Sequence, residues 1–402
     1  MDRIGWGRGV GPLAQYADAY RLELTRLGYA PGSVRNRMKL VGQLSRWLSS
    51  EGIGLAQLTS ASVEQFIASR QAAGRRRAPT PRTLIPLLDY LRDCGVVSPE
   101  QPLVTPLEVL LERYRHHLVH DRGLAPATVL HRSRWAKRFL SQRAARNGGE
   151  AGVEGLGGDE VTVYLLDCSS RLLAESAKQE SAQLRALLRF LYLKGIVETD
   201  LGAAMPPVAA WRDTRLPVTL SAAKVAALLE SCDRSQASGR RDFAILTLLA
   251  RLGLRSGEVA ALLVDDVDWR AGEILVRGKA RRIDRLPLPV EVGEALVAYL
   301  KDGRPGCEWR HLILTCYAPP RPINPSSITN VVYRACRRAG LARVGGHRLR
   351  HALATEMLRQ GGDLLEISQV LRHSDLGTTA IYAKVDRAAL RSVAQIWPGS
   401  GR

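Results

Sequence analysis

The sequence of 402 residues has few cysteines and few lysines, and it has no long apolar run. Its six cysteines are scattered without a CxxC pair, so their spacing predicts neither a zinc site nor a disulfide framework. No stretch approaches the ~20 apolar residues that cross a bilayer. The first residues, MDRIGWGRGVG, lack the apolar segment of a signal peptide. We therefore expect a soluble, cytoplasmic protein with reduced thiols and no membrane partner.

The shortage of lysine contrasts with an excess of arginine. Only eight of the 58 basic residues are Lys, and with 39 acidic residues the formal charge is +19. Such a charge favours nucleic acid as a partner, and the planar fork of Arg suits phosphates and guanine edges. A merely basic protein, or the Arg usage of a GC-rich genome, would explain the same numbers. The length predicts roughly two to three domains.

The first half of the sequence contains a duplication. The GYAP segment that begins at Gly28 is similar to the GLAP segment that begins at Gly123, at an offset of 95 residues. LLDYLRDCGVV from Leu87 is similar to LLRFLYLKGIV from Leu187, at an offset of 100. Two matches at nearly one spacing indicate two copies of a helical unit.

In each copy the sequence predicts a helix after the proline turn, with Ser33 and Thr128 as candidate N-caps. Both predicted helices carry basic residues that can contact DNA phosphates or form a solvated face. These candidates are Arg35 and Arg37 in the first copy, and Arg132, Arg134, Lys137 and Arg138 in the second.

The second half predicts a helical domain with a small sheet inserted. A proline-bearing connector at 205–217 precedes it. TLSAAKVAALLESC predicts a helix that begins near Ser221, and further helices are expected at 243–252 and 328–339. GEILVRGKARRIDRLPLP alternates as a β-hairpin does, with its turn region at Gly278.

Residues 345–385 gather the chemistry-bearing side chains. This segment reads GGHRLRHALATEMLRQGGDLLEISQVLRHSDLGTTAIYAKV, and it holds three of the eight histidines. On a helix, His347 and Arg350 would share one face. The Gly-Thr-Thr sequence after His373 can end one helix and cap the next, which leaves Tyr382 on a first turn. An Arg, two His and a Tyr grouped in this way suit phosphodiester chemistry.

Cleavage of a phosphodiester needs a nucleophile, positive charge on the non-bridging oxygens and a proton for the leaving oxygen. The tyrosine can be the nucleophile, two arginines can clamp the phosphate, and a lysine beside the hairpin strand can donate a proton. The histidines can transfer protons near neutrality. The candidate catalytic residues are Arg255, Lys279, His347, Arg350, His373 and Tyr382.

Taken singly, each candidate has an ordinary structural explanation. Arg255 could begin a helix and pair with Glu258, and His347 could be a satisfied helix histidine. Lys279 could be a solvated turn residue, and Tyr382 could be half-buried. Only the combination distinguishes a catalytic site.

The combination resembles the tyrosine recombinase (phage-integrase-like) family, over the half from about residue 216 to residue 385. The matching motifs are GLRSGE, RGKARR, HRLRH and LRHSDLGTTAIY, in that order. The departures are small. Arg372 replaces the glycine common before the histidine, GKARR lacks a glycine of the usual turn, and Val-Gly-Gly precedes His347 in place of a Thr-Pro or Ser-Pro.

The resemblance implies DNA strand exchange without metal, ATP or another cofactor. Tyr382 would attack the scissile phosphate and leave a 3′-phosphotyrosine and a free 5′-hydroxyl. Lys279 would protonate the leaving oxygen, while His373 and the two arginines would stabilise the transition state and His347 would help to move the tyrosine proton. The partner would be double-stranded DNA, with a homotetramer on two duplexes and a nucleoid-associated location.

The resemblance also implies the division into domains. We expect a helical module at 1–104 that contacts DNA or protein, a SAM-like core-binding domain at 105–210 and the catalytic domain at 211–387. The tail at 388–402 would dock on a neighbouring subunit or pack on its own. The added first module favours a mobile-element integrase or transposase. The alternatives are a type IB topoisomerase and a DNA-binding relative without catalysis.

Overall fold

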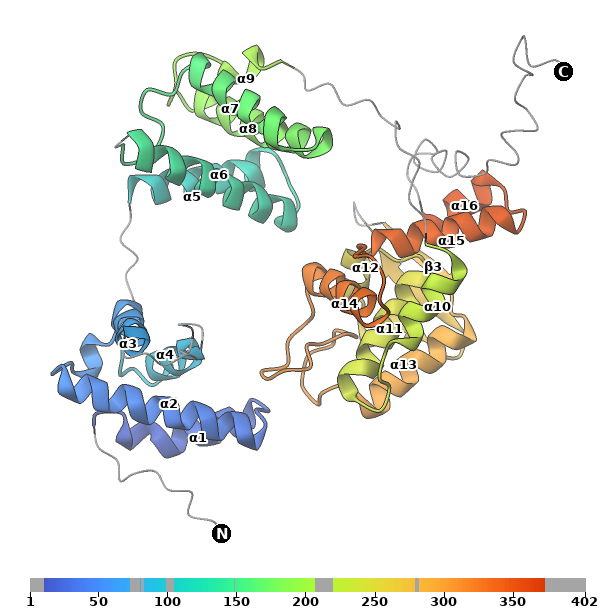
Figure 1. The fold of residues 1–402 in the computed structure, drawn as a ribbon, viewed down its shortest axis with the longest axis horizontal. Coiled ribbons are helices and arrows are strands. Elements are labelled where there is room, and N and C mark those ends of the chain that lie inside the picture. Colours follow the sequence, from blue (N-terminus) through green and yellow to red (C-terminus); the bar gives the residue numbers. More distant parts are fainter. Residues whose placement is uncertain are drawn as a thin grey trace. The chain divides into compact units, whose positions relative to one another are not determined.

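The computed structural model describes residues 11–72, 80, 83–98, 105–147, 149–206, 220–278 and 282–372 (Figure 1). Within these ranges helices predominate and the strands form one small sheet, which confirms the predicted fold class. The chain divides into two compact units, of which one is Glu100–Thr214 and the other joins Met1–Pro99 and Arg215–Arg402. None of the helices described is long and apolar enough to cross a membrane.

The first copy of the repeat is helical throughout its described residues. Its α-helices are α1 (Ala17–Arg26), α2 (Pro31–Ser50), α3 (Ser60–Ala72) and α4 (Ile85–Asp93), with 3-10 turns at Ala14–Tyr16 and Leu55–Gln57. Helix α2 buries Val34, Met38, Val41, Leu44 and Leu48. Their spacing of three or four residues places them on one face of the helix, and that face lies in the core of this copy.

The second copy repeats this pattern. Its helices are α5 (Pro106–His116), α6 (Pro126–Asn147), α7 (Gly158–Arg171), α8 (Ala174–Leu193) and α9 (Leu201–Ala204), with a π-helical turn at His117–Asp121. Thr105 and Glu108 cap the start of α5 reciprocally, since the Thr105 hydroxyl accepts from the Glu108 N–H at 3.2 Å. The core of this copy has its own buried residues, including Tyr114, Leu140, Leu188 and Phe190.

Glycines at corresponding positions show that the duplication extends to the backbone. Gly28 and Gly123 have φ values of 79° and 57°, and Gly95 and Gly195 have values of 72° and 65°. This left-handed region favours glycine because other residues place Cβ too close to the following carbonyl. The same two turns therefore follow corresponding helices in both copies.

Ser33 and Thr128 are not N-caps, so that prediction was wrong. Helix α2 begins at Pro31 and α6 begins at Pro126, which places both hydroxyl residues inside the first turn. Proline suits the first helical position because its φ is already helical and the N–H that it lacks would have no partner there. The helices consequently begin two residues before the predicted caps.

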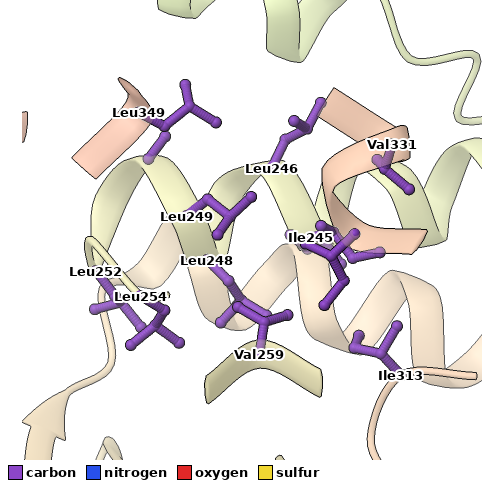
Figure 2. Close-up of a cluster of buried hydrophobic side chains, with 14 of the residues drawn as sticks. Ile245, Leu246, Leu248, Leu249, Leu252, Leu254, Val259, Ile313, Val331 and Leu349 are labelled. Atoms are coloured by element: carbon purple, nitrogen blue, oxygen red, sulfur yellow. The ribbon is translucent and has the colours of Figure 1, made fainter. Parts of the chain in front are cut away.

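The described part of the C-terminal region contains seven α-helices. They are α10 (Ala222–Glu230), α11 (Ala237–Arg251), α12 (Ser256–Ala261), α13 (Val290–Asp302), α14 (Pro325–Arg338), α15 (His347–Arg359) and α16 (Leu364–Leu371). Helix α11 lies at the centre and contacts α10, α12, α13, α14 and α15. Figure 2 shows Leu248 and Leu249 of α11 among Val259, Val331 and Leu349 from other elements. This core fixes the elements that carry the candidate site.

The predicted helices of this region are present, with two starts misplaced, since α14 begins at Pro325, three residues before its predicted start. The Ser221 hydroxyl caps α10 by accepting from the Lys224 N–H at 3.4 Å. Helix α11 begins at Ala237, six residues before the predicted start, because its first turns are polar and give no apolar signal. Two of those polar residues, Arg241 and Asp242, form a buried ion pair at 2.6 Å.

The predicted hairpin is confirmed and belongs to a three-stranded antiparallel sheet. Its strands are β1 (Val267–Asp268), β2 (Glu273–Arg277) and β3 (Ile283–Pro287), in the order β1-β2-β3. Ile274 and Val276 are buried, as the alternating pattern predicts. Strand β1 was not predicted, because two residues are too few to show alternation.

Candidate active site

Arg255 stands immediately before α12 and is held there by Glu258. The Arg255 Nη1 donates to Glu258 Oε1 at 2.7 Å, and its backbone N–H donates to Oε2 at 2.9 Å. The Glu258 side chain is 5% exposed, whereas that of Arg255 is 41% exposed. Arg255 thus begins a helix and pairs with Glu258, as the structural alternative predicted. Because its guanidinium also reaches the surface, it can still bind a phosphate.

Gly253 brings the end of α11 against α16. Its φ is +58°, and a Cβ at this position would lie 2.8 Å from Leu371 Cδ2 and 3.1 Å from Leu353 Cδ2. Glycine is required both by the left-handed backbone and by this close approach. As a result, the segment that leads to Arg255 passes directly beside the end of α16.

His347 is the first residue of α15 and lies close to the start of α12. A Cβ on the preceding Gly346 would lie only 3.1 Å from Ser256 Oγ. Desolvation by the surrounding protein lowers the pKa of His347 below its ordinary 6.5, and the positive charges of Arg350, Arg255 and Arg348 lower it further. The imidazole is therefore neutral at pH 7 and can accept a proton.

Arg350 has a different environment from Arg255. Its side chain is 0% exposed, and its Nη1 donates to the Gly253 carbonyl at 2.5 Å. Its Nη2 donates to the Leu371 carbonyl. Arg350 therefore ties the end of α11 to the end of α16, and a phosphate can contact it only if the surrounding protein moves.

Glu258 is the acidic centre of the site. Besides Arg255, it accepts from Arg372 Nη2 at 2.7 Å. A Cβ on Gly278, where strand β2 has ended, would lie 4.0 Å from Glu258 Oε1. Burial lowers the pKa of Arg372, and the Glu258 carboxylate opposes that shift. The sequence suggested Glu258 only through its spacing from Arg255, and it indicated Arg372 only as a departure from a motif.

Three of the six candidate catalytic residues are thus brought together. Lys279, His373 and Tyr382 lie outside the described residues, as does the predicted tail at 388–402. In the sequence, Lys279 directly follows Gly278 and His373 directly follows Arg372. Both of those neighbours lie at Glu258.

The candidate DNA contacts of the first copy separate into two kinds. Arg35 is exposed, whereas the Arg37 Nη1 donates to the Thr83 carbonyl at 2.7 Å. The Arg37 guanidinium also lies over the Tyr29 ring, 4.5 Å from its centroid. Arg37 therefore stabilises its own module. Lys39, which the prediction left out, is exposed on the same helix.

The second copy shows the same separation. Arg132 is half-buried beside Tyr114, and burial raises the pKa of Tyr114 to about 12 while the charge of Arg132 opposes the rise. Arg138 pairs with Glu180 at 3.0 Å. Arg134 and Lys137 are exposed. Arg134 lies 95 residues after Lys39 in the sequence, so an exposed basic residue occupies the same position in both copies.

Metal ligands are not grouped in the described ranges. In those ranges, no three His, Cys, Asp or Glu side chains lie where they could hold a metal ion. The charged groups around Glu258 are mainly guanidinium groups, whose chemistry suits a phosphate.

The chain matches the model of the phage integrase family over residues 219–388. It is 37% identical over 398 residues to integrase/recombinase y4rA of Sinorhizobium fredii, an alignment that covers 98% of this chain and 96% of that protein. It is 31% identical over 310 residues to tyrosine recombinase XerD of Mycobacterium tuberculosis, which covers 73% of this chain and 97% of that protein. The chain therefore belongs to the phage integrase family and is a tyrosine recombinase, an enzyme of site-specific DNA recombination.

Solved structures share this fold. A lambda integrase dimer bound to a COC′ core site has a TM-score of 0.51 at 19% identity and covers 73% of this chain and 99% of its own. The XerH recombinase bound to its palindromic difH substrate has a TM-score of 0.50 at 20% identity, with 74% and 99% covered.

Proposed function

We propose that this recombinase cuts and rejoins double-stranded DNA through a 3′-phosphotyrosine at Tyr382, without a metal ion or ATP. The proximity of Arg255 and His347 at the starts of α12 and α15, with Arg255 held by the buried Glu258, supports this proposal most directly. A guanidinium for the phosphate and a neutral imidazole for the proton lie there together. Lys279 and His373 directly follow Gly278 and Arg372, the two residues that lie beside Glu258.

The reaction divides the work among these side chains. The neutral imidazole of His347 accepts the proton of the Tyr382 hydroxyl, and the phenolate oxygen attacks phosphorus. As the bond to the 5′-oxygen breaks, Lys279 gives that oxygen a proton, while Arg255 and His373 stabilise the charge on the non-bridging oxygens. A 5′-hydroxyl of another strand reverses the steps. ATP is not needed, because the phosphotyrosine keeps the bond energy.

Arg350 supports this reaction by holding two backbone segments of the site in place. Its two donated hydrogen bonds hold the Gly253 and Leu371 carbonyls, each two residues from a catalytic residue. Its direct contact with the phosphate would accompany a movement of this segment when DNA binds.

The helical copies would deliver the DNA. We assign residues 105–210 to the core-binding domain and 211–387 to the catalytic domain, with the tail at 388–402 docking on a neighbouring subunit. The XerD match covers 73% of the chain, which leaves about 110 residues, the size of the first module at 1–104. That module is an additional DNA-binding or protein-binding domain, as befits a mobile-element integrase or transposase.

The enzyme would act on the nucleoid in the cytoplasm, as a homotetramer on two duplexes. A lambda integrase tetramer bound to a Holliday junction is among the similar structures, with a TM-score of 0.49. The proposal of a tetramer follows from the chemistry instead, since two duplexes exchanged strand by strand present four scissile phosphates and each active site holds one nucleophile.

Trapping of the covalent intermediate tests the proposed function. A duplex that carries the recombination site of this enzyme, nicked beside the cleavage position, loses its 5′-hydroxyl fragment after cleavage and cannot be rejoined. We expect a DNA–protein adduct that persists in EDTA and maps to the peptide containing Tyr382. An adduct that requires added metal would contradict the proposal. Relaxation of supercoils without any recombinant product would favour a type IB topoisomerase.

The pH dependence of cleavage should report His347. Because its pKa is lowered and the base must be neutral, the single-turnover cleavage rate should fall on acidification with a midpoint below 6.5. Arg348→Gln removes one of the charges that lower this pKa, so the midpoint should move upward. Arg343→Gln, whose arginine stacks on Tyr333 at 3.7 Å, is the control and should leave it unchanged. Equal pH midpoints in the two variants would show that His347 is not the base.

Salt titration of DNA binding should distinguish the exposed basic side chains that contact phosphates from those that form ion pairs within the protein. Arg134→Ala and Lys137→Ala should each reduce the slope of log affinity against log salt by about 1, as loss of one phosphate contact does. Arg115→Ala is the matched control, because Arg115 is exposed in the same copy but pairs with Glu112 at 2.8 Å. An unchanged slope in the first two variants would exclude this face of α6 from the interface.

A further inference from the structure

Arg372 has an unusual combination of backbone and burial. It is the one non-glycine residue with a positive φ, 54°, in the part of the chain that the structure describes. Its side chain is only 3% exposed. The left-handed conformation at a helix end favours glycine, and arginine is rarely buried without a partner. Both features are unfavourable, so the contacts of this side chain must compensate for them.

The contacts of Arg372 join two other elements to the end of α16. Its Nη2 donates to Glu258 Oε2 at 2.7 Å, and Glu258 belongs to α12. Its Nε lies 3.9 Å from Asp284 Oδ2 on β3. Arg372 Nε and Asp284 Oδ2 have no hydrogen-bond partner among the described residues, so these two atoms face each other as an ion pair. Elements α12, β3 and α16 lie at one end of the C-terminal region (Figure 1).

Glu258 makes the contact with Arg372 relevant to Arg255. One buried carboxylate accepts from both guanidinium groups, from Arg255 at 2.7 Å through Oε1 and from Arg372 at 2.7 Å through Oε2. If Arg372 were absent, the whole charge of Glu258 would act on Arg255. The charge that Arg255 offers to a phosphate would then be more fully neutralised.

We propose that Arg372 is a positioning residue for DNA cleavage, which shares Glu258 with Arg255 and fastens the chain just before His373 to α12 and β3. This inference rests on the catalytic roles proposed above. Strand β3 follows β2 in the hairpin, and Lys279 lies between these two strands in the sequence. Arg372 therefore links the three segments that carry Arg255, Lys279 and His373, without touching DNA itself.

The test uses Arg372→Gly and Arg372→Lys in the full chain on the nicked duplex. Glycine suits the left-handed backbone and removes the cation, whereas lysine keeps the charge. We expect the rate constant of adduct formation to fall about 10–100-fold in Arg372→Gly, as loss of alignment in an active site does, and to recover in part in Arg372→Lys. The dissociation constant for DNA should stay within about twofold of wild type, since a buried residue makes no phosphate contact.

The rate constant and the final yield of adduct distinguish positioning from folding. A merely structural role would lower the melting temperature and the yield, while the molecules that react would do so at the wild-type rate. Wild-type rate constants in both variants would overturn the inference and leave the proposed function standing. A wild-type enzyme that forms no adduct would overturn the proposed function, and this inference with it.

Discussion

Replacement of Tyr382 by Phe is expected to abolish the covalent adduct, with a fall in the cleavage rate of about 10⁴-fold or more. The substitution removes the oxygen that we propose attacks phosphorus and keeps the aromatic ring, so the change tests the nucleophile and not the packing. If a water molecule attacked phosphorus in place of this oxygen, the DNA would be cleaved but not linked to the protein, so no adduct would form. The measurement is single-turnover cleavage of the nicked duplex, followed by denaturing gel electrophoresis.

DNA binding should survive the same substitution, with a dissociation constant within about twofold of wild type, because phosphate contacts dominate affinity. Tyr317→Phe is the matched control, since Tyr317 is 81% exposed and has no proposed role. Its adduct yield should equal that of wild type. An adduct that still forms in Tyr382→Phe would assign the nucleophile to another residue.

The second large effect is a difference between the two arginines. Arg255→Ala is expected to slow cleavage by about 10²–10³-fold, the loss typical of one transition-state donor. It should change the free energy of unfolding by no more than about 1 kcal/mol, because its ion pair is partly exposed and Glu258 keeps Arg372 as a partner.

Arg350→Ala is expected to reduce both activity and stability. It removes a fully buried guanidinium and the two hydrogen bonds that it donates to the Gly253 and Leu371 carbonyls. At the usual contribution of charged hydrogen bonds, the free energy of unfolding should fall by about 3–6 kcal/mol. Urea denaturation of the two variants measures the difference. Equal stability of Arg255→Ala and Arg350→Ala would contradict the structural role of Arg350.

Local features of the fold were predictable where the signal lies within a few residues. The hairpin followed from alternation, and the predicted end of α11, residue 252, lies one residue beyond its observed end at Arg251. The start of α11 was misplaced because the polar pair Arg241 and Asp242 is buried through tertiary contacts. Ser33 and Thr128 were misassigned because proline at the first helical position competes with a hydroxyl cap.

The sequence predicted that three described residues of the candidate site lie together, but it did not predict their environments. The motifs identified Arg255, His347 and Arg350 as a set. They did not indicate that one arginine is 41% exposed and the other 0% exposed. Nor could they indicate that Glu258 binds Arg372 as well as Arg255, because the contact with Arg372 joins residues 114 positions apart.

The sequence by itself determined the family, the order of the catalytic motifs and the duplicated helical unit, because residue types and short spacings carry that information. Only the tertiary structure decided how the charges are shared. Burial and pairing arise when distant segments pack together, and a guanidinium binds a phosphate, a carbonyl or a carboxylate according to what packing brings near it. At Glu258, packing places two cations on one acid, and the site depends on that arrangement.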